Sequence, residues 1–278
     1  MNAMLMQTKP STALLVLDAA ALTLGTCHFG PFSTSVRAGE RIAILGPSGA
    51  GKSTLLTLMS GERAAAGGQV QFLGRGLATW SLQDRAHHRA VLPQSSEVAF
   101  GLPVELVIGL GRVARAHDPL LDPIVKQAAS LARAAHLLGR RFDTLSGGER
   151  ARVQMARVFA QLWDVNDGLV LVDEPLAALD PGLQFDLLDS LDSYAAQRGH
   201  AVVAILHDIN HAVLGFDRLW LVADGKLVDD VACSAAAVPA LEALYGIALT
   251  CMTNAQGDLV ITPTRRLARR VAQDAVLA

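Results

Sequence analysis

The stretch Gly46-Pro47-Ser48-Gly49-Ala50-Gly51-Lys52-Ser53-Thr54 decides the fold. It fits the phosphate-binding pattern G-x-x-x-x-G-K-[ST], with an apolar run at 41–45 typical of a buried strand before it and an apolar run at 55–59 typical of a helix after it. The glycines let successive backbone N–H groups turn towards phosphate oxygens at the positive helix N-terminus. Lys52 is expected to reach the β- and γ-phosphates, and the Ser53 hydroxyl to ligate Mg²⁺. The stretch predicts binding of a nucleoside triphosphate.

The composition sets limits on the whole chain. Its 278 residues, 51% hydrophobic and 18% charged, suit an ordered α/β domain with an embedded smaller lobe, or two small domains. With a net charge of -2 the chain lacks the excess of positive charge that is typical of nucleic-acid-binding proteins. The odd number and wide spacing of Cys27, Cys233 and Cys251 argue against a disulfide framework or a zinc site. No run approaches the ~20 apolar residues that span a bilayer, so a membrane connection must come through a partner of a cytosolic protein.

Strands and helices alternate around the loop. Residues 13–45 are expected to form short strands with turns at Gly30-Pro31 and at 38–39, and Asp224-Gly225 predicts a hairpin. Residues 100–163 are expected to be a helical insertion, with one helix opened by Asp122 and Pro123 and ended by Gly139. The other predicted strands are 69–73, 90–94, 169–173, 201–206, 219–222 and 226–228, and two further helices are predicted from Glu149 and from Asp180-Pro181 to Gly199.

Polar side chains follow several of these predicted strands. Gln94, Asp173, Glu174 and His207 stand at strand ends, which in a parallel sheet meet at the edge where ligands bind. Asp173 is expected to hold Mg²⁺ through its second shell, and Glu174 to accept a proton from the attacking water. Gln94 is expected to touch the metal or the water, and His207 the γ-phosphate. The set predicts phosphoryl transfer to water.

A second anion-binding turn occurs at Leu145-Ser146-Gly147-Gly148-Glu149. A Ser-Gly-Gly turn that leads straight into a helix offers a hydroxyl and free N–H groups. Because this turn belongs to the helical lobe, we expect it to lie far from the phosphate loop of its own chain. One γ-phosphate can be bound by both only if a second copy presents its turn across an interface.

Together these motifs resemble those of the ATP-binding subunits of ABC transporters. The resemblance runs through the Walker A loop at 46–54, the Q-loop residue Gln94, the signature at 145–149, the Walker B end Asp173-Glu174, the D-loop at 178–180 and the switch His207. It implies an α/β ABC-type nucleotide-binding fold: a RecA-like P-loop core with an antiparallel β subdomain and an inserted helical subdomain. The implied bounds are 1–95 for the antiparallel β region and first part of the core, 96–162 for the helical signature subdomain, 163–232 for the second part of the core, and 233–278 for a C-terminal extension.

The resemblance also implies roles for the motif residues. It implies a head-to-tail homodimer that sandwiches two ATP molecules with Mg²⁺ and drives a membrane permease, with a periplasmic substrate-binding protein as an indirect partner and no nucleic acid. The dimer would sit peripherally on the cytoplasmic face of the inner membrane. The implied ATP-binding residues are Gly46, Pro47, Ser48, Gly49, Ala50, Gly51, Lys52, Ser53 and Thr54; those reaching the partner's ATP are Ser146, Gly147, Gly148, Glu149 and Asp180; the metal residues are Ser53, Gln94 and Asp173; the catalytic residues are Glu174, His207 and Gln94.

The chain departs from the family pattern at two places. The family usually stacks an aromatic side chain on adenine, and here the segment before the loop offers only His28 or Phe29. The D-loop begins with Ala177, where a serine is common, which alters the hydrogen bonds expected across the dimer.

Within the family, the stretches 89–94 and 150–163 and Leu244-Tyr245-Gly246 resemble the ATPases of haem (hemin) importers. The first interpretation is therefore haem import, and import of a ferric siderophore or cobalamin is the alternative. A DNA-repair or translation ATPase of the superfamily is disfavoured, since the insertion after Gln94 is short and lacks sustained heptads and the chain has one cassette. A metabolite kinase or a GTPase would leave 145–149 unexplained. The apolar segment 98–103 either docks a permease helix or packs within the lobe.

Overall fold

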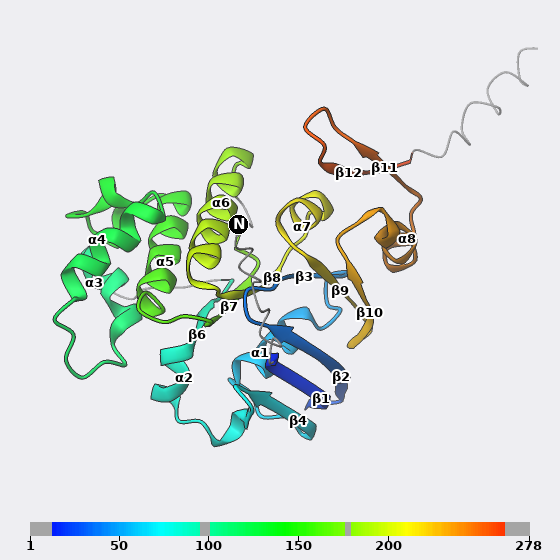
Figure 1. The fold of residues 1–278 in the computed structure, drawn as a ribbon, viewed down its shortest axis with the longest axis horizontal. Helices are drawn as coiled ribbons and strands as arrows, with labels where there is room; N and C mark the ends of the chain where they lie inside the picture. The colour runs from blue at the N-terminus through cyan, green and yellow to red at the C-terminus, as the bar shows by residue number, and fades with distance from the viewer. Residues whose placement is uncertain (1–12, 95–100, 176–178, 265–278) are drawn as a thin grey trace, which may run out of the picture.

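A computed structural model of the chain describes residues 13–94, 101–175 and 179–264 (Figure 1). The strands are β1 (Ala13–Leu24), β2 (Cys27–Arg37), β3 (Arg41–Leu45), β4 (Gly67–Phe72), β5 (Arg75–Gly76), β6 (Arg89–Leu92), β7 (Leu169–Asp173), β8 (Ala201–Ile205), β9 (Arg218–Ala223), β10 (Lys226–Ala232), β11 (Leu249–Thr253) and β12 (Leu259–Pro263). The α-helices are α1 (Lys52–Ser60), α2 (Leu82–His88), α3 (Val104–Gly109), α4 (Leu121–Leu131), α5 (Gly147–Gln161), α6 (Pro181–Arg198), α7 (Ile209–Gly215) and α8 (Val238–Tyr245).

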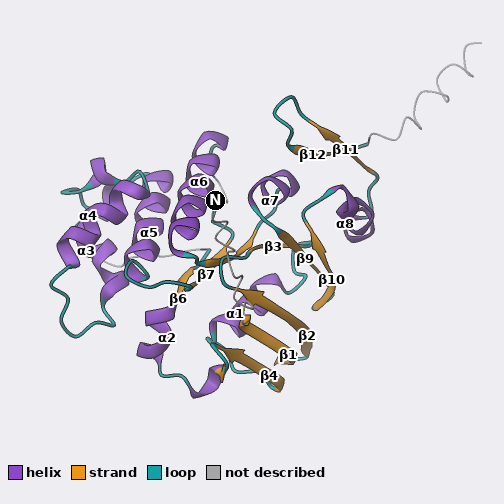
Figure 2. Ribbon diagram, viewed as in Figure 1, coloured by secondary structure: helices purple, strands orange, loops and turns teal. Residues whose placement is uncertain are grey.

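The strands form three sheets within this described part (Figure 2). A four-stranded antiparallel sheet has the order β2-β1-β4-β5, and a six-stranded sheet has the order β10-β9-β3-β8-β7-β6. In the second sheet β9, β3, β8, β7 and β6 are parallel, and β10 is an antiparallel edge strand. Strands β11 and β12 form a separate hairpin sheet near the C-terminal end.

The six-stranded sheet is buried on both faces, because alternate residues of each strand point to opposite sides. Ile42 and Ile44 of β3 face a core shared with α1 and the four-stranded sheet. Ala43 and Leu45 face a second core, which holds the buried residues of α3 to α8. Helices α1 and α5 therefore lie on opposite faces of the sheet, as Figure 1 shows.

Several local predictions are confirmed. Asp224 and Gly225 join β9 to β10 with φ values of 48° and 74°, the left-handed pair that a two-residue hairpin requires. The Asp180 side chain accepts a hydrogen bond from Leu183 N at 3.0 Å and caps α6, which Pro181 opens. The α6 helix ends at Arg198 and is followed by the left-handed cap residue Gly199, whose φ is 69°.

Two local predictions are wrong. Gly30-Pro31 lies inside the long strand β2 and forms no turn between strands; a register shift between Ala20 and Leu22 of β1 absorbs the irregularity, and β2 is an edge strand, where a residue without an N–H is tolerated. The helix predicted to run from Asp122 to Gly139 ends at Leu131, because the chain turns through left-handed Arg133 (φ 54°) into a 3₁₀ turn at Ala135–Leu137.

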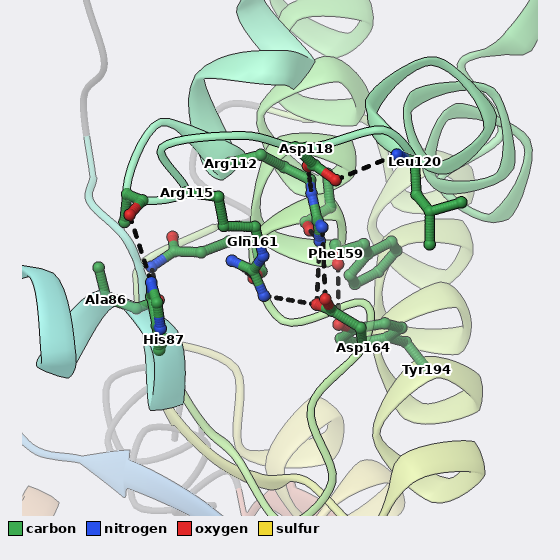
Figure 3. A network of polar contacts seen from close by, with 12 residues as sticks. Ala86, His87, Arg112, Arg115, Asp118, Leu120, Phe159, Gln161, Asp164 and Tyr194 are labelled. Atoms are coloured by element: carbon green, nitrogen blue, oxygen red, sulfur yellow. Dashed lines mark hydrogen bonds and ion pairs between the residues drawn. The ribbon is translucent and has the colours of Figure 1, made fainter.

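The helical lobe is held together by a buried polar network around Arg112 (Figure 3). Its guanidinium pairs with Asp118 through Nε, and Nη1 lies 3.0 Å from Asp164 Oδ1 and 3.1 Å from Ala160 O. Gln161 Nε2 donates to Ala86 O and to Arg89 O, both at 2.9 Å. The end of α5 is thereby tied to the segment that enters β6 and precedes Gln94.

Replacing Arg112 by Met is expected to lower the free energy of unfolding by about 3 kcal/mol, because the largely buried Asp118 loses the guanidinium that pairs with it, while Asp164 keeps its ion pair with Arg115. Chemical denaturation measures this change. Arg141→Met is the matched control, because Arg141 pairs with Asp143 on the exposed surface and its loss should have no measurable effect. Equal stability of Arg112→Met and the wild type would contradict the prediction.

Candidate active site

The phosphate loop has the geometry of an anion cradle. Gly49 and Gly51 have φ values of 80° and 99°, which residues with a Cβ rarely adopt, and Gly51 precedes α1 without a side-chain cap. A Cβ on Gly46 would lie 2.1 Å from Val222 O, so the loop also needs glycine for its close approach to β9. The N–H groups at the start of α1 remain available to phosphate oxygens.

Lys52 is almost completely buried inside this loop. Its Nζ donates to Gly46 O at 2.9 Å and to Pro47 O at 3.0 Å, which curls the side chain over the loop. Burial lowers the pKa of Lys52 from its ordinary value, and the nearby carboxylates of Glu174 and Asp173 oppose that shift. The ammonium group is thus held where a triphosphate would offer it better partners than two carbonyls.

Asp173, at the end of β7, faces the first turn of α1. Ser53 Oγ donates to Asp173 Oδ1 at 3.3 Å. Burial raises the pKa of Asp173, and Ser53 and Lys52 act to lower it while Glu174 raises it further. A cation at this point would favour the ionised form of Asp173. A hydroxyl beside a carboxylate is the hard oxygen donor set that suits Mg²⁺, so these residues fit the metal.

Glu174 is held by two of the other predicted residues. Gln94 Nε2 donates to one carboxylate oxygen at 2.5 Å, and His207 Nε2 lies 2.8 Å from the other. Glu174 has a positive φ of 48°, a strained conformation for a residue with a side chain. The end of β7, the end of β6 and the end of β8 therefore bring a carboxylate, an amide and an imidazole together, as the strand-end argument predicted.

The signature turn opens α5 with a complete capping box. Ser146 Oγ accepts from Glu149 N at 3.3 Å, and Ser146 N donates to Glu149 Oε2 at 2.8 Å. A Cβ on Gly148 would lie 2.4 Å from Leu183 Cδ2, whereas a Cβ on Gly147 would meet open space. The Glu149 side chain is thus used in capping α5, and the exposed backbone of Gly147 is the part of the turn that is available to contact another molecule.

A cavity of about 220 Å³ lies between the first turn of α5 and the candidate catalytic residues Gln94 and Glu174. Gly147 and Arg150 line one side, and Gln94 and Glu174 line the other. Among the described residues that line it, none belongs to the phosphate loop at 46–54. The structure therefore places the signature on the opposite face of the sheet from α1, next to the strand ends of the site but not over its own phosphate cradle.

The segment before the loop shows how the two candidate adenine residues lie. Phe29 packs against the loop: a Cβ on Gly51 would lie 2.8 Å from Phe29 Cδ1. His28 is exposed, and its Nδ1 lies 3.1 Å from Thr23 Oγ1. Phe29 is thus the aromatic side chain beside the cradle, and its contact with adenine stays a prediction. Ala177 and Ala178 of the D-loop and residues 98–100 of the apolar segment lie outside the described residues.

Comparison with known proteins decides the family. A family model described as ABC transporter matches residues 29–177, more than half of the chain. The chain belongs to the ABC transporter family. It is also 48% identical to the hemin import ATP-binding protein HmuV of Pseudomonas aeruginosa over 193 residues, which cover 69% of this chain and 75% of the relative. The protein of the same name from Methylobacillus flagellatus is 39% identical over 237 residues, 83% of this chain and 88% of the relative.

Solved structures agree on the fold of this ABC ATPase. A transporter assigned to the metal-chelate type, in an inward-facing conformation, superposes with a TM-score of 0.75 at 22% identity, covering 91% of this chain and 98% of the other. The ADP conformation of an ATP-binding cassette of an ABC transporter gives a TM-score of 0.73 at 20% identity, covering 85% and 98%. The predicted α/β ABC-type nucleotide-binding fold is confirmed.

Two residues near the candidate site, Tyr245 and Asn210, were given no role in the site by the sequence, although Tyr245 belongs to a stretch that resembles haem-importer ATPases. Burial raises the pKa of the Tyr245 hydroxyl, and a backbone hydrogen bond from Gly46 opposes that rise, so α8 reaches the start of the phosphate loop. Asn210 follows His207 by three residues and bonds to β12. Only the closeness of Asn210 to His207 in the sequence could have drawn attention to it.

Proposed function

We propose that this ABC ATPase powers the import of haem through a membrane permease. The proposal rests on the sequence similarity to relatives named hemin import ATP-binding protein, which are 39–48% identical to this chain over two thirds or more of its length. We further propose that it acts at the cytoplasmic face of the inner membrane, with a periplasmic substrate-binding protein as an indirect partner and no nucleic acid. Among the described residues no helix is long and apolar enough to cross a membrane.

The proposed working form is a homodimer with two ATP molecules between the copies. Helices α1 and α5 lie on opposite faces of one sheet, Gly147 is exposed with open space beside it, and the cavity that it lines includes no residue of the phosphate loop. This arrangement supports a site completed by a second copy. Ser146 and Gly147 of the second copy would contact the γ-phosphate, and Asp180 would lie near the same interface. Gly148 and Glu149 would shape the turn that presents them.

In the proposed mechanism, Mg²⁺ neutralises phosphate charge when ATP is bound, and Ser53, Gln94 and Asp173 would hold it. Lys52 and the backbone of residues 46–54 bind the triphosphate. Glu174 accepts the proton of the attacking water, and His207 Nε2, 2.8 Å away, holds the carboxylate in place.

We propose the domain boundaries 1–95, 96–162, 163–232 and 233–278 for this ATPase.

Deletion of the gene tests the cargo. Growth on haem as the sole iron source is expected to stop, while growth on a ferric siderophore or with limiting cobalamin continues, because the ATPase would serve only the haem permease. Complementation with the wild-type gene should restore growth, and complementation with Glu174→Gln should not. Normal growth on haem in a strain without a redundant system would refute the haem assignment, and loss of growth on a siderophore or cobalamin would favour the alternative cargo.

A further inference from the structure

The side-chain amide of Asn210 hydrogen-bonds α7 to the C-terminal hairpin. Asn210 Nδ2 donates to Ile261 O at 3.1 Å, and Ile261 N donates to Asn210 Oδ1 at 2.8 Å. Both backbone polar groups of one β12 residue are thus paired with one amide, as a neighbouring strand would pair them. Only a side chain with a donor and an acceptor side by side can make this pair.

Asn210 belongs to the first turn of the helix that follows His207. Asp208 caps α7 by accepting hydrogen bonds from Asn210 N at 2.7 Å and from His211 N at 3.0 Å. His207 directly precedes this cap and leaves β8 towards Glu174, which its Nε2 contacts at 2.8 Å. A shift of the first turn of α7 would therefore shift His207.

The other strand of the hairpin, β11, has an anchor of its own. Leu249 N, at the start of β11, donates to Glu242 Oε1 of α8 at 2.7 Å, and α8, whose Leu241 is fully buried, packs against β9. Tyr245, at the end of α8, reaches the backbone of Gly46. The segment from α8 to β12 thus connects the start of the phosphate loop to α7, the helix that follows His207 (Figure 1).

We propose that Asn210 is a positioning residue for His207: the Asn210–Ile261 pair lets the hairpin hold the first turn of α7, and with it His207 against Glu174. The inference rests on the proposed role of His207 in hydrolysis. Asn210 is not among the residues proposed to bind ATP, and its side chain is paired with Ile261, so its effect should fall on turnover and not on ATP affinity.

Replacing Asn210 by Leu in the full-length protein tests the proposal. The turnover number for ATP is expected to fall about tenfold, because a small misplacement of a catalytic group is costly. The dissociation constant for ATP should stay within about twofold, since the residues that bind phosphate are untouched. The variant Asn210→Asp keeps the acceptor for Ile261 N and loses the donor to Ile261 O, so its turnover number should also be lower than that of the wild type. Asn166→Leu, at an exposed asparagine, is the matched control and should leave turnover unchanged.

The double variant with His207→Ala separates positioning from general destabilisation. If Asn210 acts through His207, adding Asn210→Leu to His207→Ala costs no further turnover. Two results would overturn the inference and leave the proposed function intact. In one, Asn210→Leu lowers the turnover of His207→Ala as much as it lowers that of the wild type. In the other, His207→Ala has slow turnover but Asn210→Leu alone has the wild-type rate. Unchanged turnover in His207→Ala would instead refute the proposed role of His207, and the inference with it.

Discussion

Replacing Glu174 by Gln is expected to slow ATP hydrolysis by about 10²–10³-fold, because an amide cannot accept the proton of the attacking water. The variant should still bind ATP. Its side chain has nearly the same shape, and the phosphate loop and Lys52 are unchanged. Steady-state release of phosphate and equilibrium binding of ATP measure the two properties separately. Glu62→Gln, at an exposed carboxylate, is the matched control and should hydrolyse ATP at the wild-type rate.

The same variant tests the dimer. If two copies close on ATP and reopen only after hydrolysis, Glu174→Gln should accumulate as a dimer when ATP and Mg²⁺ are present, and the wild type should not. Light scattering coupled to gel filtration gives the mass directly. A Glu174→Gln protein that binds ATP and remains a monomer would contradict the shared site, though not the role of Glu174 in proton transfer.

The clustering of the candidate site residues was predictable, because they lie at or just after the ends of strands that pair in one parallel sheet. Asp173 ends β7, while His207 follows the end of β8 and Gln94 the end of β6 by two residues each, and both strands pair with β7. Continuous apolar runs identify such strands in the sequence, and parallel pairing then brings their carboxyl ends to one edge. No knowledge of individual contacts was needed for this step.

Features that depend on tertiary contacts were not predictable in the same way. Gly30-Pro31 reads as a turn, and only pairing with β1 shows that it lies within an edge strand. The end of α4 at Leu131 is set by the turn at Arg133, a residue with no special preference for a left-handed conformation. The pair of Asn210 with Ile261 joins residues 51 positions apart, and nothing in local composition signals it.

The Lys52→Ala variant is expected to lose ATP. Within the described part of the chain the ammonium group donates to the carbonyls of Gly46 and Pro47, and Lys52 is almost completely buried. Phosphate oxygens would give it charged partners, so most of its electrostatic contribution appears only when ATP is bound. Removing one member of such a buried charge pair should weaken ATP binding by at least about 30-fold and abolish measurable hydrolysis.

The fold should survive this substitution, which makes the loss interpretable. Lys52 is the first residue of α1, where alanine is a good helix former, so thermal denaturation should show a small shift. Lys126→Ala, at an exposed lysine of α4, is the matched control and should bind ATP normally. Titration with a fluorescent ATP analogue measures both variants. Unchanged affinity in a folded Lys52→Ala protein would refute the role of Lys52, and it would mean that the backbone N–H groups of the loop suffice to hold the triphosphate.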